Sequence, residues 1–187
     1  MFFLLRDNFS DLLFVYSHIP KTGGTSIRGG GSNYKGAFSV VDSCRIIKDN
    51  WKHKFSFTVH RNPFERFLSA YSDFKDNRNF KLELEDVINK LDKFDYNKAI
   101  NDLGSFEHHV LPQSDPLWGA DKMNHKLCHE NLRNELRDLF RNYDIKNPLL
   151  PMHRKSKSNH YVLTKQQKSK LYAFYKKDFE DLNYYTV

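Results

Sequence analysis

The sequence predicts an α/β fold, a single domain over residues 1–187 with a central parallel sheet flanked by helices. Three observations support this fold class. An apolar run at 12–16 precedes a glycine-containing loop and a helix start, and a strand pattern at 55–60 runs directly into a helix pattern at 63–74. A chain of 187 residues with 39% hydrophobic residues and 16 Phe is large enough for one domain with its own core.

The loop after the first predicted strand has the residues of an anion-binding site. Two adjacent glycines let the backbone turn and let its N–H groups approach a ligand, and Thr25 or Ser26 can cap the following helix. A helix N-terminus favours an anion, and Lys21 adds a positive charge to the same loop. We therefore expect a phosphate or sulfate to bind at Pro20, Lys21, Thr22, Gly23, Gly24, Thr25 and Ser26.

The order of residues in this loop differs from that of a nucleotide-binding P-loop. In that motif Gly-Lys-Ser/Thr follows four variable residues, whereas here Lys21 precedes the glycines and Pro20 precedes the lysine. A nucleotide kinase would also need a carboxylate for magnesium, and no acidic residue is placed like one. The alternative without a function is a glycine-rich turn that carries a solvated lysine.

Helical periodicity predicts further helices at 63–74, at 82–91, at 131–140 and after Thr164. Pro63 is tolerated in a first helical turn because its missing N–H would be unpaired there anyway. The last helix carries an apolar and largely aromatic stripe, which we expect to be core rather than a binding site: Leu171, Phe174, Tyr175 and Phe179.

The remaining segments are less regular. A short helix at 25–32 would end at three consecutive glycines, and within the ambiguous stretch 33–54 the residues 40–47 can form a helix. Residues 104–121 contain two prolines and two glycines and predict a long loop, which in a compact domain is often functional. A weak strand is expected at 126–128 and a basic loop at 148–160.

Composition limits the range of partners and of sites. The net charge of +7 suits a polyanionic partner such as a nucleotide cofactor, an acidic glycan or a nucleic acid. Cys44 and Cys128 are far apart without zinc-ligand spacing, so we expect two reduced core thiols. The apolar opening at 1–5 is too short for a signal peptide or a membrane span, which predicts a cytoplasmic protein.

A second candidate site begins where the strand at 55–60 ends. Arg61 offers a bidentate fork for a phosphate, and Ser69, two helical turns further on, adds a hydroxyl donor. Both can face the crevice in which open parallel sheets bind ligands. The structural alternative is an ion pair between Arg61 and Glu65 at the surface.

These two segments resemble the cofactor-binding motifs of the sulfotransferases, most closely those of the carbohydrate branch. The run His18–Ser26 resembles the 5′-phosphosulfate loop, and Arg61–Tyr71 resembles the 3′-phosphate site. The run Pro151–Lys157 resembles the family's late loop, and His129–Leu132 and Lys177–Glu180 resemble two further family segments. The resemblance implies a P-loop-type sulfotransferase fold and the donor 3′-phosphoadenosine-5′-phosphosulfate (PAPS), with PAP, 3′,5′-ADP, as product.

The resemblance also assigns roles to individual residues. Lys21 would act in catalysis at the phosphosulfate, Arg61 and Ser69 would hold the 3′-phosphate, and the late loop would contribute Arg154, Lys155 and Ser156. The chain departs from the family pattern at Met152 and Arg154, and at His60, where most relatives have an apolar residue. The departures at Met152 and Arg154 put the individual contacts of the late loop in question.

The general base is the open question of this assignment. Many relatives carry a histidine in a Lys-His-Ala context, where this chain has Lys35-Gly36-Ala37. His109 is the best replacement, because it precedes Pro112-Gln113 in a run that resembles the family's His-x-x-Pro-Gln loop. Its neighbour His108 and the more distant His53 are the other candidates.

The predicted function is therefore sulfuryl transfer from PAPS to an acceptor hydroxyl, with a carbohydrate as the expected acceptor. No metal is required, because cationic side chains can neutralise the phosphosulfate, and no nucleic acid partner is expected. The alternatives are a catalytically silent relative that binds PAP or another polyanion, and a P-loop nucleotide kinase. Golgi members of the family carry an N-terminal anchor, so a trimmed Golgi-type protein is the alternative to a cytoplasmic one.

Overall fold

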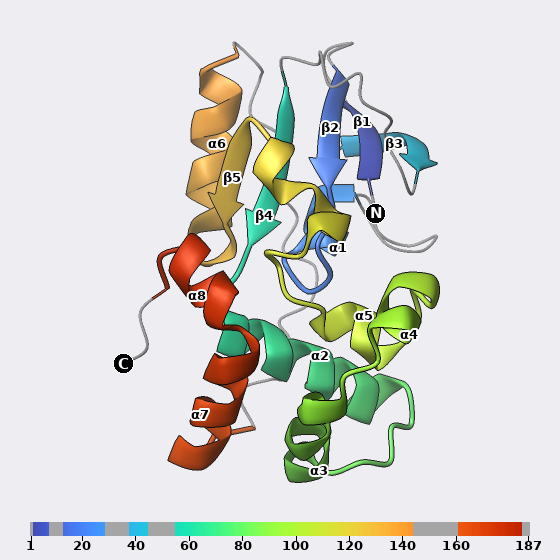
Figure 1. Cartoon of the computed structure of the whole chain (residues 1–187). Helices are drawn as coiled ribbons and strands as arrows, with labels where there is room; N and C mark the ends of the chain where they lie inside the picture. The colour runs from blue at the N-terminus through green and yellow to red at the C-terminus, as the bar shows by residue number, and fades with distance from the viewer. Residues whose placement is uncertain (1, 8–12, 29–37, 45–54, 144–160, 185–187) are drawn as a thin grey trace. The chain divides into compact units, whose positions relative to one another are not determined.

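The computed structural model describes residues 2–7, 13–28, 38–44, 55–143 and 161–184 (Figure 1). Its contacts group into two compact units: Met1–His60 with Trp118–Arg154, and Arg61–Leu117 with Lys155–Val187. We describe each unit by itself, and a single domain over residues 1–187 stays a prediction.

The first unit contains a five-stranded mixed sheet in the order β3-β1-β2-β4-β5. Strand β1 is antiparallel to both of its neighbours, whereas β2, β4 and β5 run parallel to one another. The parallel part confirms the α/β class predicted from the sequence. The strands are β1 (Phe2–Asp7), β2 (Leu13–Ser17), β3 (Phe38–Cys44), β4 (Ser56–His60) and β5 (His125–Cys128).

The register of the parallel strands brings their carboxyl ends to one edge of the sheet. Ser17 of β2 pairs with Thr58 of β4, and His60 at the end of β4 pairs with Cys128 at the end of β5. Each of these strands is followed at this edge by a loop or a short helix. Open parallel sheets bind their ligands at this edge, so the topology makes it the expected place for a ligand site.

The core of the first unit forms between the sheet and helix α6 (Leu132–Arg141), which packs against β5 (Figure 1). Tyr16 and Phe57 stack with ring centroids 4.9 Å apart, and Leu136 and Phe140 of α6 complete the same cluster. The short helix α1 (Gly24–Arg28) packs against β3 and buries Ile27. Helices thus flank the sheet, as predicted.

The second unit is helical, and its longest helix is α2 (Pro63–Asn77). Pro63 occupies the first turn as predicted, and the Asn62 side chain caps the helix by accepting from two backbone N–H groups. The other helices are α3 (Leu84–Asn89), α4 (Tyr96–Asn101), α5 (Phe106–Val110), α7 (Lys165–Phe174) and α8 (Lys176–Asp181), with a 3₁₀ turn at Lys90–Lys93.

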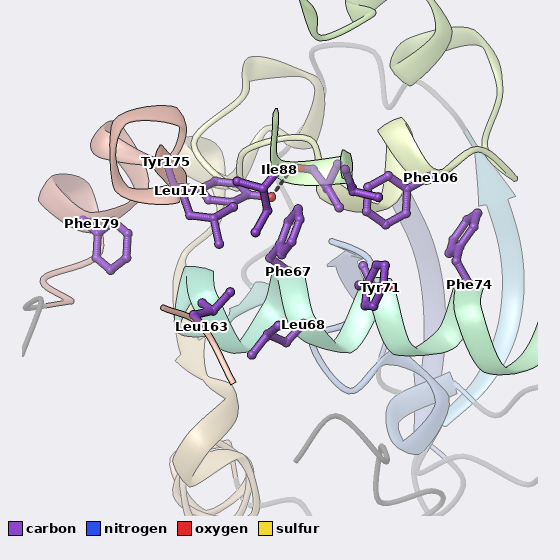
Figure 2. Close-up of a cluster of buried hydrophobic side chains, with 13 residues drawn as sticks. Phe67, Leu68, Tyr71, Phe74, Ile88, Phe106, Leu163, Leu171, Tyr175 and Phe179 are labelled. Carbon is purple, nitrogen blue, oxygen red and sulfur yellow. Dashed lines mark hydrogen bonds between the residues drawn. The ribbon is translucent and has the colours of Figure 1, made fainter. Parts of the chain in front are cut away.

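Aromatic side chains from α2, α5 and α8, and from Tyr175 between α7 and α8, dominate the core of the second unit (Figure 2). Phe67 and Phe74 of α2 meet Phe106 of α5 in edge-to-face contacts, with ring centroids 6.0 and 5.3 Å apart. The predicted stripe after Thr164 is confirmed as core at Leu171, Tyr175 and Phe179, which are at most 3% exposed. Its fourth member, Phe174, is only partly buried. Thr164 also caps α7 in a reciprocal capping box.

Several predicted elements are wrong in type or extent. Residues 38–44, assigned in part to a helix at 40–47, form strand β3, because β1 offers them a hydrogen-bonding edge far away in sequence. The predicted long loop at 104–121 contains α5 and the 3₁₀ turns Pro116–Trp118 and Ala120–Lys122. The predicted last helix is interrupted after Phe174, and α8 begins at Lys176.

Candidate functional site

The loop between β2 and α1 holds two residues in the left-handed backbone region. Lys21 has φ of 68° and Gly23 has φ of 91°. Glycine adopts this region freely, whereas a residue with a Cβ is strained there by roughly 1–2 kcal/mol. Strain of this kind at a non-glycine residue persists only where the surroundings impose it, and it occurs frequently at functional sites.

The loop is held in place by buried groups next to Lys21. Ile19 and Thr22 are at most 1% exposed, and the Thr22 hydroxyl donates to the Ile19 carbonyl at 2.8 Å. The Gly23 carbonyl accepts from the backbone N–H groups of Ser26 and Ile27, which connects the loop to α1. The buried Thr22 hydroxyl thus has a structural role, and the strained position of Lys21 lies inside a fixed turn.

Side chains of the same unit pack against both loop glycines. A Cβ built on Gly24 would lie 2.1 Å from Nε2 of His18, and one built on Gly23 would lie 3.0 Å from Leu132 and 3.3 Å from Cδ2 of His129. From the sequence, two reasons were expected for glycine at these positions: the backbone turns there, and its N–H groups can approach a ligand closely. The structure confirms the turn at Gly23 and adds that neither position has room for a larger side chain.

The predicted phosphate-binding residues therefore fall into two groups. Pro20, Thr22 and Gly24 are buried, whereas Lys21, Gly23, Thr25 and Ser26 are partly exposed. The loop presents one cation and two hydroxyl groups, which is a donor set that suits a phosphate or a sulfate. Because α1 is described over only five residues, these side chains rather than a helix dipole would hold an anion here.

Further polar residues gather at the carboxyl ends of β4 and β5. The Glu135 carboxylate accepts from the backbone N–H of Cys128 at 2.6 Å, and the Cys128 thiol donates to Glu130 at 2.8 Å. Cys128 forms no disulfide, but it is only half-buried, so the prediction of a core position is wrong for this cysteine. Burial lowers the pKa of the neighbouring His60, and the nearby carboxylates of Glu130 and Glu135 partly oppose this shift.

The second candidate segment, Arg61 to Ser69, lies in the second unit. The Gln113 side chain bonds both backbone groups of Arg61: its oxygen accepts from the N–H at 2.9 Å and its amide donates to the carbonyl at 2.8 Å. The Arg61 side chain is 12% exposed and lies 3.8 Å from the carboxylate of Glu65. The ion pair considered as the structural alternative is therefore present. Ser69 is 3% exposed, so its hydroxyl is nearly closed off from solvent.

Two buried residues that sequence reasoning did not single out, Asp178 and Arg66, hold this segment in place. The Asp178 carboxylate is fully buried and accepts from the backbone N–H groups of Gln113 and Ser114 at 2.8 and 2.7 Å. The Arg66 guanidinium, also fully buried, donates to the carbonyls of His109 and Leu111. The resemblance pointed to Pro112-Gln113 and to the run 177–180, but not to the contact between them.

The candidate base His109 is part of this framework. Its Nδ1 lies 2.8 Å from the Ser105 carbonyl, its Nε2 lies 3.4 Å from Nη2 of Arg78, and its ring packs on Phe74. A ring with Nδ1 bonded to a carbonyl must use the lone pair of Nε2 as its base, and that atom faces a guanidinium donor. His108 is 4% exposed and bonded to the Ala99 carbonyl, which is a structural role.

Four predicted residues lie outside the described part of the chain: His53, Arg154, Lys155 and Ser156. Among the described residues, no group of three or more His, Cys, Asp or Glu side chains is arranged to hold a metal ion. Within the same residues, no helix combines the length and the apolar character that crossing a bilayer requires.

Fold and site together define an α/β protein with a lysine-bearing, anion-suited loop at the carboxyl edge of its parallel strands. No family model, curated protein or solved structure matches the chain. The assignment of a function therefore depends on the residues themselves.

Proposed function

We propose that the chain is a sulfotransferase that transfers a sulfuryl group from PAPS to an acceptor hydroxyl, with a carbohydrate as acceptor. The observation that carries the proposal is Lys21, a non-glycine residue fixed at φ of 68° in the loop that follows β2. The loop's sequence resembles the 5′-phosphosulfate loop, and its partly exposed groups suit that anion.

In this proposal Lys21 stabilises the negative charge that develops on the leaving phosphate oxygen. Thr25 and Ser26 supply hydroxyl donors beside it, and the buried anchors Ile19 and Thr22 keep the loop in one conformation. PAPS supplies the sulfuryl group and a leaving group whose charge is spread over phosphate oxygens. Catalysis of this kind consists of positioning and electrostatic stabilisation, as in phosphoryl transfer.

The resemblance assigns Arg61 and Ser69 to the 3′-phosphate of the donor. The Arg61 backbone is fixed by Gln113, which supports a defined direction for its side chain. Glu65 lies 3.8 Å away and is more than half exposed, so it can move aside when a phosphate competes for the guanidinium. Because Ser69 is only 3% exposed and the Arg61 side chain is 12% exposed, we expect the 3′-phosphate to contact Arg61 more readily than Ser69.

A catalytically silent binder of PAP is the second candidate. The observation in its favour is the environment of His109, whose two ring nitrogens face the Ser105 carbonyl and the Arg78 guanidinium. A ring whose two nitrogens have these partners is poorly placed to take a proton from an acceptor hydroxyl, and the described residues of its segment include no replacement. Both candidate functions require binding of 3′,5′-ADP, but only the sulfotransferase transfers a sulfuryl group.

The test measures binding and turnover in the same preparation of the full chain. Calorimetry with 3′,5′-ADP and with 5′-AMP checks the 3′-phosphate assignment, because Arg61→Ala should weaken only the first ligand appreciably. A charged hydrogen bond of this kind contributes about 1.5–3 kcal/mol, or about 10- to 150-fold in affinity. Equal losses for both ligands would remove Arg61 from the 3′-phosphate site.

Turnover is followed with PAPS labelled in its sulfuryl group and a panel of unsulfated glycans and simple glycosides. Lys21→Ala should reduce transfer to less than about a hundredth, a typical loss for one stabilising donor. Alanine and lysine are similarly strained at positive φ, so the substitution removes the charge without adding backbone strain. Transfer at more than about a tenth of the wild-type rate would contradict the role of Lys21. Binding of 3′,5′-ADP without any transfer would favour the silent binder.

A further inference from the structure

Three histidines lie at or just beyond the carboxyl ends of the parallel strands in the first unit. His18 follows β2, His60 ends β4, and His129 follows β5 directly. Parallel pairing of β2 with β4 and of β4 with β5 brings these three positions to the same edge of the sheet. The sequence separates them by up to 111 residues, so only the strand pairing reveals the cluster.

The ring of His129 lies against Gly23 of the proposed phosphate-binding loop, two residues after Lys21. A Cβ built on Gly23 would lie 3.3 Å from Cδ2 and 3.8 Å from Nε2 of His129, so the edge of the ring that carries Nε2 faces the loop. His129 is partly exposed and can therefore be reached by a substrate. The absence of a side chain at Gly23 is what allows this approach.

The turn that carries His129 is fixed on both sides. The residue before it, Cys128, donates its backbone N–H to Glu135 and its thiol to Glu130, and the residues after it lead into α6. Leu132, one turn further on, also contacts the Gly23 position. The imidazole is thus held on a short rigid segment, which a general base needs in order to be positioned.

The other histidines are less suited to accept a proton at this loop. His18 fills the space beside Gly24, and its ring packs between Phe3 and Tyr16 with centroid distances of 5.8 and 5.6 Å. The Nδ1 atom of His60 is buried, and desolvation lowers the pKa of this residue. Both are better placed for packing than for chemistry.

We propose that His129 is the general base of the sulfuryl transfer, an inference that rests on the proposed function. The imidazole takes the proton of the acceptor hydroxyl while the hydroxyl oxygen forms a bond to sulfur. The bond between sulfur and the 5′-phosphate oxygen breaks in the same step, and its electron pair remains on the phosphate, next to Lys21. The products are a sulfate ester, 3′,5′-ADP and an imidazolium that releases its proton to water.

The test compares His129→Ala with His129→Phe, which keeps an aromatic ring against Gly23 but has no basic nitrogen. Transfer from labelled PAPS is measured to the unsulfated glycan panel and to water, because attack by water also requires loss of a proton and needs no identified acceptor. Both variants should lower kcat by about 10²–10⁴-fold with little change in 3′,5′-ADP affinity. The matched control is His125→Ala, which removes a histidine at the start of β5, four residues before His129.

Chemical rescue separates a base from a packing residue. Added imidazole should restore part of the activity of His129→Ala, where a cavity is left, and none of that of His129→Phe. Full turnover in both variants, or a loss that imidazole does not restore, would overturn the assignment. If the wild-type chain binds 3′,5′-ADP but transfers nothing, the base assignment fails while the cofactor site stands. If it binds neither ligand, the proposed function itself fails.

Discussion

The contact between Gly24 and His18 offers a stringent test of the loop geometry. In Gly24→Ala the new Cβ would lie 2.1 Å from Nε2 and 2.5 Å from Cδ2 of His18, whereas carbon atoms in contact are about 3.5–4 Å apart. The ring must therefore move by more than about 1 Å, and Phe3 and Tyr16 pack on it. Overpacking of this kind costs about 1–3 kcal/mol.

The effect of Gly24→Ala on the free energy of unfolding should change sign when the His18 ring is removed. Gly24 is the first residue of α1 and its φ is not positive, so alanine fits its backbone and can be up to about 1 kcal/mol more favourable than glycine in a helix. In a His18→Ala background, Gly24→Ala should be neutral or stabilising. The double-mutant cycle should thus show a coupling of at least about 1 kcal/mol.

The assay is urea unfolding of the wild-type chain, both single variants and the double variant, followed by far-UV circular dichroism. Gly23→Ala is the matched contrast, because the strain of alanine at φ of 91° is independent of the His18 ring. His18→Ala should therefore not relieve it. An equal loss from Gly24→Ala with and without the His18 ring would show that the ring does not occupy the space beside Gly24.

Two further predictions concern the framework around the site. Arg66→Met should lower the free energy of unfolding by about 3 kcal/mol, because the carbonyls of His109 and Leu111 lose a charged donor. Arg66→Lys should lower it by less, since a positive donor remains. Urea unfolding measures both variants, and a change below about 1 kcal/mol for Arg66→Met would contradict the role of the guanidinium. Burial lowers the pKa of His60, so the unfolded chain binds more protons than the folded chain, and the free energy of unfolding should fall as the pH drops below about 6.5. His60→Gln should flatten this pH dependence between pH 8 and 5. An unchanged slope would refute the contribution of His60.

Local signals in the sequence were sufficient for the parts of the chain that depend on neighbouring residues. The apolar run before the loop, the proline at the first turn of α2 and the capping threonine before α7 were all predicted and are confirmed. The loop residues Lys21 and Gly23 were also identified from sequence, because turn chemistry and charge are properties of a short segment.

Tertiary contacts determined the secondary structure of the segments whose local sequence pattern was weak. Strand β3 forms because β1 pairs with it. Helix α5 forms in a proline-bearing stretch whose carbonyls accept from the buried Arg66 of α2 and from the buried Tyr175 between α7 and α8. The interruption between α7 and α8 was likewise not predicted, since the apolar spacing continues across it. Residues far apart in sequence supply these contacts.

The sequence by itself determined the α/β class, the anion-suited loop and the aromatic core of the last helices. Only the tertiary structure decided that His109 faces Arg78 and that His129 lies against Gly23. The physical reason is that the position of a side chain beside a loop depends on strand order and register. Parallel pairing of β5 with β4 and of β4 with β2 places the turn after Cys128 next to a loop more than one hundred residues earlier in the chain.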